Sequence, residues 1–218
     1  MMRFVRILES GLIAVLAAVV VVGISVWILE LPWFTSAVVP RVTSPEATGL
    51  EPEIILDQAQ GVREFVTSRA AEPLPATVGG RAAFDESAVS HLIDVRELML
   101  DARQATMLLA VLLIVLIGQC LLTGWERVAS RGLRAGGWVA LAGVAFAAFF
   151  GTADFGAFFT RFHDLFFEPG TWVFASNALL IQLFPETFWT IAGLILGLFV
   201  AIGALGIIVV GRLVDVFS

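Results

Sequence analysis

Long apolar runs alternate along this chain with segments that are rich in polar residues. Four runs approach the roughly 20 residues that a helix needs to cross the hydrocarbon core of a bilayer. They cover about residues 12–31, 105–125, 137–155 and 188–210, and the third is rich in alanine and glycine. The pattern predicts an all-α membrane protein with four transmembrane helices. Tryptophans near the ends of these runs are typical of the interfacial aromatic belt, namely Trp27, Trp33, Trp125, Trp138 and Trp189.

The first run has a second interpretation, because Arg3 and Arg6 precede it as in a secretory signal peptide. Signal peptides have an apolar region of only about 7–15 residues, followed by a cleavage site of small residues. The run here is longer, and no such site follows it. We therefore expect a retained helix.

The two longer polar segments, residues 32–104 and 156–187, are expected to form a cap outside the membrane. Prolines constrain the backbone and remove a hydrogen-bond donor. We therefore expect the start of the first segment to be irregular or extended, since it holds Pro32, Pro40, Pro45 and Pro52.

Helical periodicity returns later in that segment. An apolar stripe predicts an amphipathic helix over residues 53–69, and a stretch rich in proline and glycine at 72–80 ends it. Asp85 is then expected to cap a helix that starts near Glu86 and continues into the second membrane helix.

Arginines in the short flanking segments predict the orientation. The two tails and the loop expected after the second helix carry a net charge of +3, whereas the two longer segments together with the adjoining Glu30 and Asp154 carry −9. Both termini are therefore expected in the cytoplasm, with the cap on the other side. The six arginines that decide this are Arg3, Arg6, Arg127, Arg131, Arg134 and Arg212.

Composition excludes several classes of function. At 218 residues, with 59% hydrophobic residues and a mean hydropathy of +0.94, the chain is expected to form a single membrane domain over residues 1–218. It has no lysine, which excludes a Schiff base and a nucleotide-binding lysine. Its one cysteine, Cys120, provides neither a disulfide framework nor a thiolate zinc cluster. The net charge of −6 argues against a nucleic-acid partner.

The two histidines are the most promising chemical groups. His91 and His163 each lie where a predicted membrane helix meets an outer segment. Because the histidine pKa lies near neutrality, such a pair can exchange protons with a substrate at the membrane surface. Asp94, three residues after His91, is expected to orient its ring. A buried histidine satisfied by a carboxylate is the structural alternative. No metal-ligand spacing involves either histidine, so no metal is predicted.

Aromatic residues crowd the second outer segment. Eleven of the 24 aromatic residues lie between Phe155 and Trp189. They either anchor the chain at the interface or line a pocket that confines acyl chains. We expect the first of them to continue the third membrane helix, before a turn at 168–170 and a short helix near 177–184. The candidate pocket residues are Phe159, Phe162, Phe166, Phe167 and Trp172.

Glycines four residues apart, at Gly193 and Gly197, indicate close packing of helices. That motif is common among membrane helices and carries no chemistry.

A family resemblance becomes visible in these motifs. The chain resembles the lipoprotein intramolecular transacylase (Lit) family of bacterial membrane proteins over most of its length. It differs from the family pattern in having Leu92 after the first histidine, arginine at position 96 and no tyrosine. The residues that carry the resemblance are Glu86, His91, Leu92, Asp94, Val95 and Arg96, then Phe162, His163, Leu165, Phe166 and Phe167, then Thr171 and Trp172, and finally Leu183, Phe184, Pro185, Glu186, Phe188 and Trp189.

The resemblance implies a catalytic pair, His91 and His163, with Asp94, Glu86, Arg96 and Glu186 in support. It implies transfer of the sn-2 acyl chain of a diacylglyceryl-cysteine lipoprotein to the α-amino group of that cysteine, giving a lyso-form lipoprotein. Expected partners are diacylglyceryl-modified lipoproteins and membrane lipids, with no nucleotide and no cofactor. The expected location is the bacterial cell membrane, with the active site on the extracytoplasmic face.

Two alternatives remain open at this point. A distant paralogue can use another acyl acceptor. A non-enzymatic scaffold or partner-binding subunit can instead use the aromatic cap as a docking surface.

Overall fold

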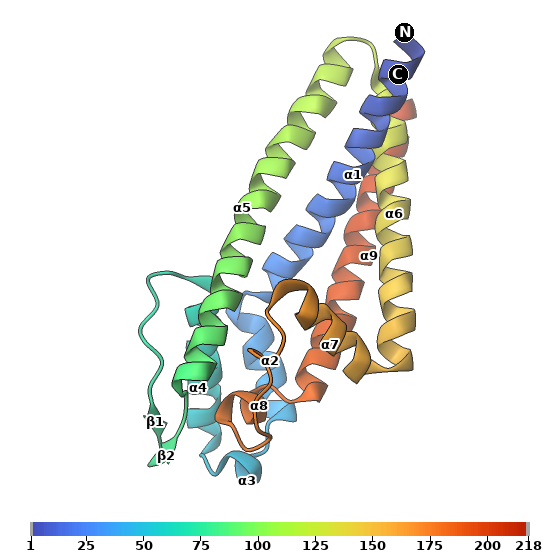
Figure 1. Cartoon of the computed structure of the whole chain (residues 1–218). Helices are drawn as coiled ribbons and strands as arrows, with labels where there is room; N and C mark the ends of the chain where they lie inside the picture. Colours follow the sequence, from blue (N-terminus) through green and yellow to red (C-terminus); the bar gives the residue numbers. More distant parts are fainter. Residues whose placement is uncertain (1, 217–218) are drawn as a thin grey trace. The chain divides into compact units, whose positions relative to one another are not determined.

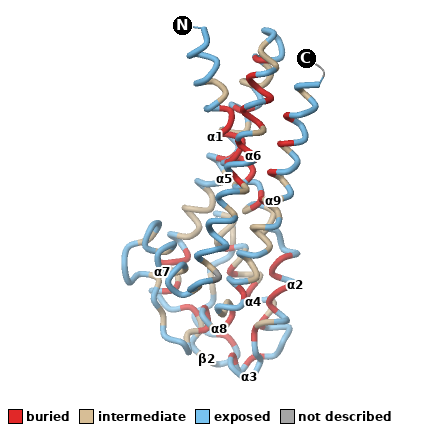
Figure 2. Tube along the Cα trace, turned by 90° about the vertical axis from the view of Figure 1, so that its right-hand side faces the viewer, coloured by how far each residue is buried: buried red, intermediate tan, exposed pale blue. Residues whose placement is uncertain are grey.

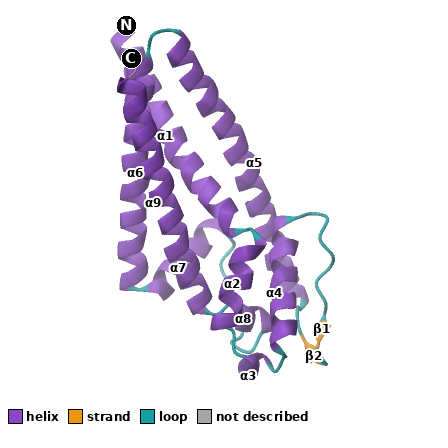
Figure 3. Cartoon of the chain, turned by 180° about the vertical axis from the view of Figure 1, so that it is seen from behind, coloured by secondary structure: helices purple, strands orange, loops and turns teal. Residues whose placement is uncertain are grey.

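Helices make up most of the described chain, and the remainder consists of loops and one short hairpin (Figures 1 and 3). The computed structural model describes residues 2–216, without the side chain at position 152. Four helices are long and apolar enough to cross a membrane, which confirms the predicted class. They are α1 (Met2–Leu29), α5 (Glu86–Leu122), α6 (Glu126–Ala153) and α9 (Glu186–Val216).

The first turn of α5 confirms the predicted cap, because the Asp85 carboxylate accepts a hydrogen bond from the Ala88 amide at 2.8 Å. The helix then continues without interruption to Leu122.

The third membrane helix begins well before residue 137, so its predicted start is wrong. Arg127, Arg131 and Arg134 lie within α6 and not in a loop. The carbonyl of Trp125 accepts hydrogen bonds from Val128 and Ala129 and so begins the helix. Hydropathy locates apolar residues and not helix ends, and arginine is a good helix former.

The prolines of the first polar segment start helices, so the predicted irregular stretch is also wrong. Pro32, Pro45 and Pro52 are the first residues of α2 (Pro32–Val42), α3 (Pro45–Thr48) and α4 (Pro52–Thr67), and Pro40 lies inside α2. Proline suits the first helical position because its missing donor is unpaired there in any case.

The predicted amphipathic helix is confirmed as α4, and the break after it is confirmed as well. Within the break, β1 (Thr77–Val78) pairs with β2 (Arg81–Ala82) in an antiparallel hairpin that the sequence analysis did not predict.

The aromatic segment begins with a separate helix, α7 (Phe155–Phe166), and does not extend α6 as expected. Asp154 interrupts the helix with extended backbone, and its side chain accepts a hydrogen bond from the Ala157 amide at 2.9 Å. The predicted short helix is confirmed as α8 (Leu179–Leu183).

The chain divides into two compact units, and the first comprises Met1–Trp27, Ala102–Thr152 and Ile195–Ser218. Buried residues follow α1 and α6 within it (red in Figure 2). One apolar cluster joins α1 to α6 and α5 around Ile13, Ala17, Ala129 and Cys120. A second, which includes Ala18, Val200 and Ala204, joins α1 to α9.

The second unit comprises Ile28–Asp101 and Ala153–Leu194. In it α2 packs against α4, and α8 contacts α3 and α4. The hydroxyl of Thr43, which follows α2, donates a hydrogen bond at 2.9 Å to the carbonyl of Leu183 in α8. The Arg81 guanidinium, on the hairpin, donates to the carbonyls of Thr48 and Asn177. Segments far apart in the sequence are thereby fastened together.

Close helix packing in the first unit depends on glycines of α6 and not on the predicted pair. A Cβ added at Gly136 would lie 2.6 Å from the carbonyl oxygen of Ala14, and one at Gly132 would lie 2.6 Å from Ile13. By contrast, a Cβ at Gly193 meets nothing within 4 Å, and one at Gly197 meets only Val144 at 3.5 Å. Among the described residues Gly193 therefore has no close helix neighbour, contrary to the prediction, whereas Gly197 lies in ordinary van der Waals contact with α6.

Substituting Gly136 by valine should lower the stability of the protein by about 1–3 kcal/mol. The new side chain would clash with the backbone of α1 at Ala14, and the two helices would have to move apart. Thermal unfolding in detergent measures the effect. Gly143→Val is the matched control, since Gly143 lies on the same helix and a Cβ there meets nothing within 4 Å. Equal losses in both variants would point to helix propensity and contradict the packing argument.

Candidate active site

The second unit brings the two histidines together. His91 lies near the start of α5 and His163 lies on α7, and the centres of their rings are 6.3 Å apart with an angle of 32° between the planes. His91 is only 8% exposed, and His163 is half-buried. At this spacing both imidazoles can reach one polar group of a substrate.

Aromatic rings form the surroundings of the pair. Phe167 contacts both histidines, with its ring centre 5.0 Å from that of His91 and 5.7 Å from that of His163. Phe174 lies 5.6 Å from His91. Phe159 and Trp172 lie 4.0 and 4.8 Å from His163. The result is an apolar wall around two titratable groups.

Helical geometry fixes the tautomer of His163. One helical turn separates it from Phe159, and its Nδ1 lies 2.9 Å from the Phe159 carbonyl oxygen. Because a carbonyl oxygen only accepts, Nδ1 must carry the hydrogen. The other nitrogen, Nε2, is then left to exchange a proton with a substrate.

A tight turn after α7 returns the chain to His163. Gly170 adopts the left-handed conformation with φ of 89°, which favours glycine. The Thr171 hydroxyl and amide both donate to the carbonyl of Glu168. This turn, predicted from the sequence, places Trp172 against the imidazole of His163.

Two buried polar atoms beside the pair have no hydrogen-bond partner within the described part of the chain. They are Nδ1 of His91 and the indole Nε1 of Trp172. Asp94 was expected to orient His91, but it is exposed and no hydrogen bond joins the two described side chains. Because Asp94 points away on the solvated side of the helix, it acts on His91 through charge alone.

Burial disfavours a charge on both imidazoles. Burial lowers the pKa of His91, the neighbouring His163 lowers it further, and Asp94 partly opposes both effects. Burial also lowers the pKa of His163, against the hydrogen bond to Phe159 and the charge of Asp164. Both rings lie outside the apolar parts of the membrane helices. His163 lies on α7, which is not one of the four candidate spans. His91 lies near the start of α5, and the apolar part of that helix begins only after Arg103. The hydrogen bond to the Phe159 carbonyl therefore favours a charge on His163 and has no counterpart at Nδ1 of His91.

The remaining predicted site residues differ in their positions. Glu86 and Glu186 are the exposed first residues of α5 and α9, and among described residues neither side chain contacts a histidine. Phe162 meets the edge of the His163 ring at 5.7 Å, whereas Phe166 is 46% exposed and its ring contacts that of Phe162.

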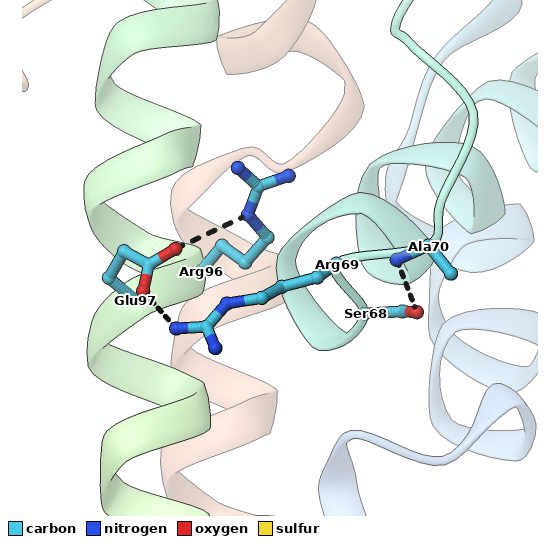
Figure 4. A network of polar contacts seen from close by, with 5 residues as sticks. All are labelled: Ser68, Arg69, Ala70, Arg96 and Glu97. Carbon is cyan, nitrogen blue, oxygen red and sulfur yellow. Dashed lines mark hydrogen bonds and ion pairs between the residues drawn. The ribbon is translucent and has the colours of Figure 1, made fainter.

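Arg96 joins α5 to α4. Its guanidinium lies 4.8 Å from the ring centre of Phe65, and its Nε is 3.9 Å from Glu97, which also binds Arg69 (Figure 4). Arg96 therefore supports the helix that carries His91 and does not touch the pair.

Phe174 is a wall residue that the sequence analysis did not include in the candidate pocket. The available signal was the spacing of two residues between the aromatic side chains of Trp172 and Phe174. Both are partly buried, whereas Thr171 and Val173 are exposed. Such a period of two is typical of a strand-like segment with one covered side.

Within the described residues, no group of three or more histidine, cysteine, aspartate or glutamate side chains is positioned to hold a metal ion.

Fold and site together define an integral membrane protein of the lipoprotein transacylase type. Three solved structures of the lipoprotein intramolecular transacylase Lit from Bacillus cereus share its fold. Two of them, a histidine-to-arginine and a histidine-to-alanine variant, match with a TM-score of 0.78 and 13% identity over 98% of this chain, covering 93% and 95% of theirs. Another structure of this protein matches with a TM-score of 0.74 and 15% identity, over 97% of this chain and 96% of that one.

The family model described as lipoprotein intramolecular transacylase Lit matches residues 10–189. The chain belongs to this family, and it is an acyltransferase of the lipoprotein intramolecular transacylase class. The alternative of a non-enzymatic docking subunit is therefore set aside. No protein of curated function matches the chain by sequence.

Replacing Phe167 by alanine should lower the initial rate of lipoprotein transacylation at least about 10-fold, because displacement of reacting groups by only about 1 Å can cost 100-fold. Phe167 contacts both imidazoles, so its loss loosens their mutual geometry. Phe166→Ala is the control, as the neighbouring ring is exposed and contacts neither histidine. Similar rates for the two variants would show that the wall does not position the pair.

Proposed function

We propose that this enzyme moves the sn-2 acyl chain of a diacylglyceryl-cysteine lipoprotein from its glyceryl oxygen to the α-amino group of the same cysteine. The product is a lyso-form lipoprotein. The observation that carries the proposal is the pair of imidazoles, 6.3 Å apart, within an aromatic wall. Membership of an intramolecular transacylase family supports it, because donor and acceptor then belong to one lipoprotein.

The reaction requires one base and one acid. The α-ammonium group first loses a proton to solvent, and the neutral amine nitrogen then attacks the ester carbonyl carbon to form a C–N bond. The nitrogen of the tetrahedral intermediate gives a second proton to the base, and the departing glyceryl oxygen takes up a proton from the acid as the C–O bond breaks. Since the product is an isomer of the free-amine substrate, the equation needs no co-substrate.

His91 is assigned as the base and His163 as the acid. The assignment follows from the contacts of each ring. His163 disfavours a charge on His91, so His91 stays neutral and able to accept the proton that the attacking nitrogen gives up. The Phe159 carbonyl holds the Nδ1 hydrogen of His163 and favours its protonated form, so that Nε2–H can donate to the leaving oxygen.

The aromatic wall supplies the other requirements of the reaction. Phe159, Phe167 and Trp172 offer apolar surface to acyl chains on either side of the pair. Excluding water protects the ester from hydrolysis. Holding the amine against the carbonyl carbon supplies effective molarities of about 10⁵–10⁸ M in well-oriented intramolecular reactions.

We further propose that both termini lie in the cytoplasm and that the histidine pair lies on the extracytoplasmic face, among cap segments 32–104 and 156–187. The arginines of the tails and of the first turns of α6 support this orientation. Lipoproteins and membrane lipids are then the partners that reach the site.

Mass spectrometry of the N-terminal peptide of a test lipoprotein examines the proposal directly. In cells without other N-acylating enzymes, the wild type should leave the number of acyl chains unchanged while moving one chain to the α-amine. His91→Ala and His163→Ala should each abolish the transfer, because each removes one of the two proton carriers.

Membrane insertion and thermal unfolding of both variants provide the control for folding. Transfer that persists in either well-folded variant would contradict the paired acid and base. Transfer to an acceptor other than the α-amine would contradict the proposed substrate chemistry.

The pH dependence of kcat/KM tests the assignment of roles. Asp94 raises the pKa of His91, so Asp94→Asn should lower that pKa and move the acidic limb to lower pH. Asp164 raises the pKa of His163, so Asp164→Asn should move the basic limb to lower pH. Both carboxylates are exposed, which makes the two variants a matched pair. In the wild type the acidic limb should lie below about 6.5, the ordinary histidine pKa. If Asp94→Asn instead moved the basic limb and Asp164→Asn the acidic limb, His163 would be the base and His91 the acid.

A further inference from the structure

The indole N–H of Trp172 is a buried donor without an acceptor beside the histidine pair. Burying an N–H group without a hydrogen-bond partner costs free energy, and such groups are uncommon in folded proteins. Its ring centre lies 4.8 Å from that of His163 and 6.3 Å from that of Phe159. The unpaired donor is therefore part of the wall that surrounds the proposed reaction centre.

Local structure holds this donor in place. The turn at Glu168–Gly170, closed by both polar groups of Thr171, directs the chain back over α7. The indole then packs against the imidazole of His163, with the Phe159 ring centre 6.3 Å from its own. A donor fixed in this way needs no reorganisation when charge develops next to it.

Other side-chain donors around the pair are already committed. Nδ1–H of His163 bonds to the Phe159 carbonyl, and the Thr171 hydroxyl donates to Glu168. Nε of Arg96 is also a buried donor without an acceptor, but its guanidinium lies over the Phe65 ring of α4. The proposed proton transfers occupy His91 and Nε2 of His163, and the phenyl rings offer no donor. The reaction nevertheless creates an oxyanion, because attack by the amine converts the ester carbonyl into a tetrahedral alkoxide.

We infer that Trp172 is a catalytic residue whose Nε1–H donates a hydrogen bond to the carbonyl oxygen of the migrating acyl chain and stabilises that oxygen as the oxyanion. The inference rests on the proposed function. The hydrogen bond forms when the ester enters the site and strengthens as the C–N bond forms. It remains with the amide carbonyl once the C–O bond has broken, and the indole gives up no proton.

The direct test replaces the indole N–H by sulfur. Incorporation of β-(3-benzothienyl)alanine at position 172 retains the shape of the ring and removes the donor, and Trp172→Phe removes it with a smaller ring. Loss of one oxyanion donor lowers kcat by about 100- to 1,000-fold in known cases. We expect a decrease of about 100-fold with little change in KM and with both pH limbs unmoved.

Trp189 provides the matched control. Its ring also contacts Phe159, at 6.0 Å, but its Nε1–H already donates to the Phe184 carbonyl at 3.1 Å. The same sulfur analogue at position 189 should leave kcat unchanged. An unchanged kcat at position 172 would overturn the inference. A shift of the pH limbs there would overturn it as well, since it would show that the indole acts through His163.

Product analysis separates this inference from the proposed function. Mass spectrometry of the wild-type product identifies the group that accepts the acyl chain. The ratio of kcat between the wild type and the sulfur analogue reports the hydrogen bond from the indole N–H, whichever group accepts the acyl chain. If the wild type proves inactive, proton NMR of ¹⁵N-indole-labelled enzyme gives the answer. An N-acetylated diacylglyceryl-cysteine peptide, which cannot react, should shift the Nε1–H resonance that Trp172→Phe removes. No shift at saturating peptide would overturn the inference.

Discussion

Two imidazoles held 6.3 Å apart in an aromatic wall cannot both carry a proton without a large cost, and the chemistry of this enzyme depends on that constraint. Burial lowers the pKa of each ring, and the charge of one ring opposes the charge of the other. A pair of this kind holds at most one proton with ease. The hydrogen bond from His163 to the Phe159 carbonyl favours a proton on His163. This asymmetry distinguishes the acid from the base without any other charged group in contact.

The second unit provides this arrangement with helices and not with loose loops. Prolines start α2, α3 and α4, and Asp85 and Asp154 cap the two helices that carry the histidines. Arg69, Arg96 and Glu97 join α5 to α4 and the residues that follow it. Short, capped elements give each imidazole a fixed origin, which loops of the same length would not.

Much of the fold could be predicted because apolar runs and caps are local signals. The four membrane helices, α4, the Asp85 cap and the turn before Trp172 all follow from residues close in sequence. The start of α6 and the proline helices were missed because hydropathy and proline rules describe average behaviour, whereas helix starts depend on individual caps. Proximity of the two histidines was expected only from family motifs. The contact of Phe174 with His91 and the exposure of Asp94 depend on how distant segments pack, which no local pattern specifies.

The single proton that the pair accommodates has a further consequence for the catalytic cycle. On the proposed assignment, His91 ends each turnover protonated and His163 ends it neutral. The protonation states of the two rings are then the reverse of those at the start. A proton must cross from one ring to the other, or exchange with solvent, before the next lipoprotein can react. The wall that protects the ester from water, including Phe167 in contact with both rings, also obstructs this return. The departure of the acylated product, which opens the site to solvent, is then the step that restores the resting enzyme.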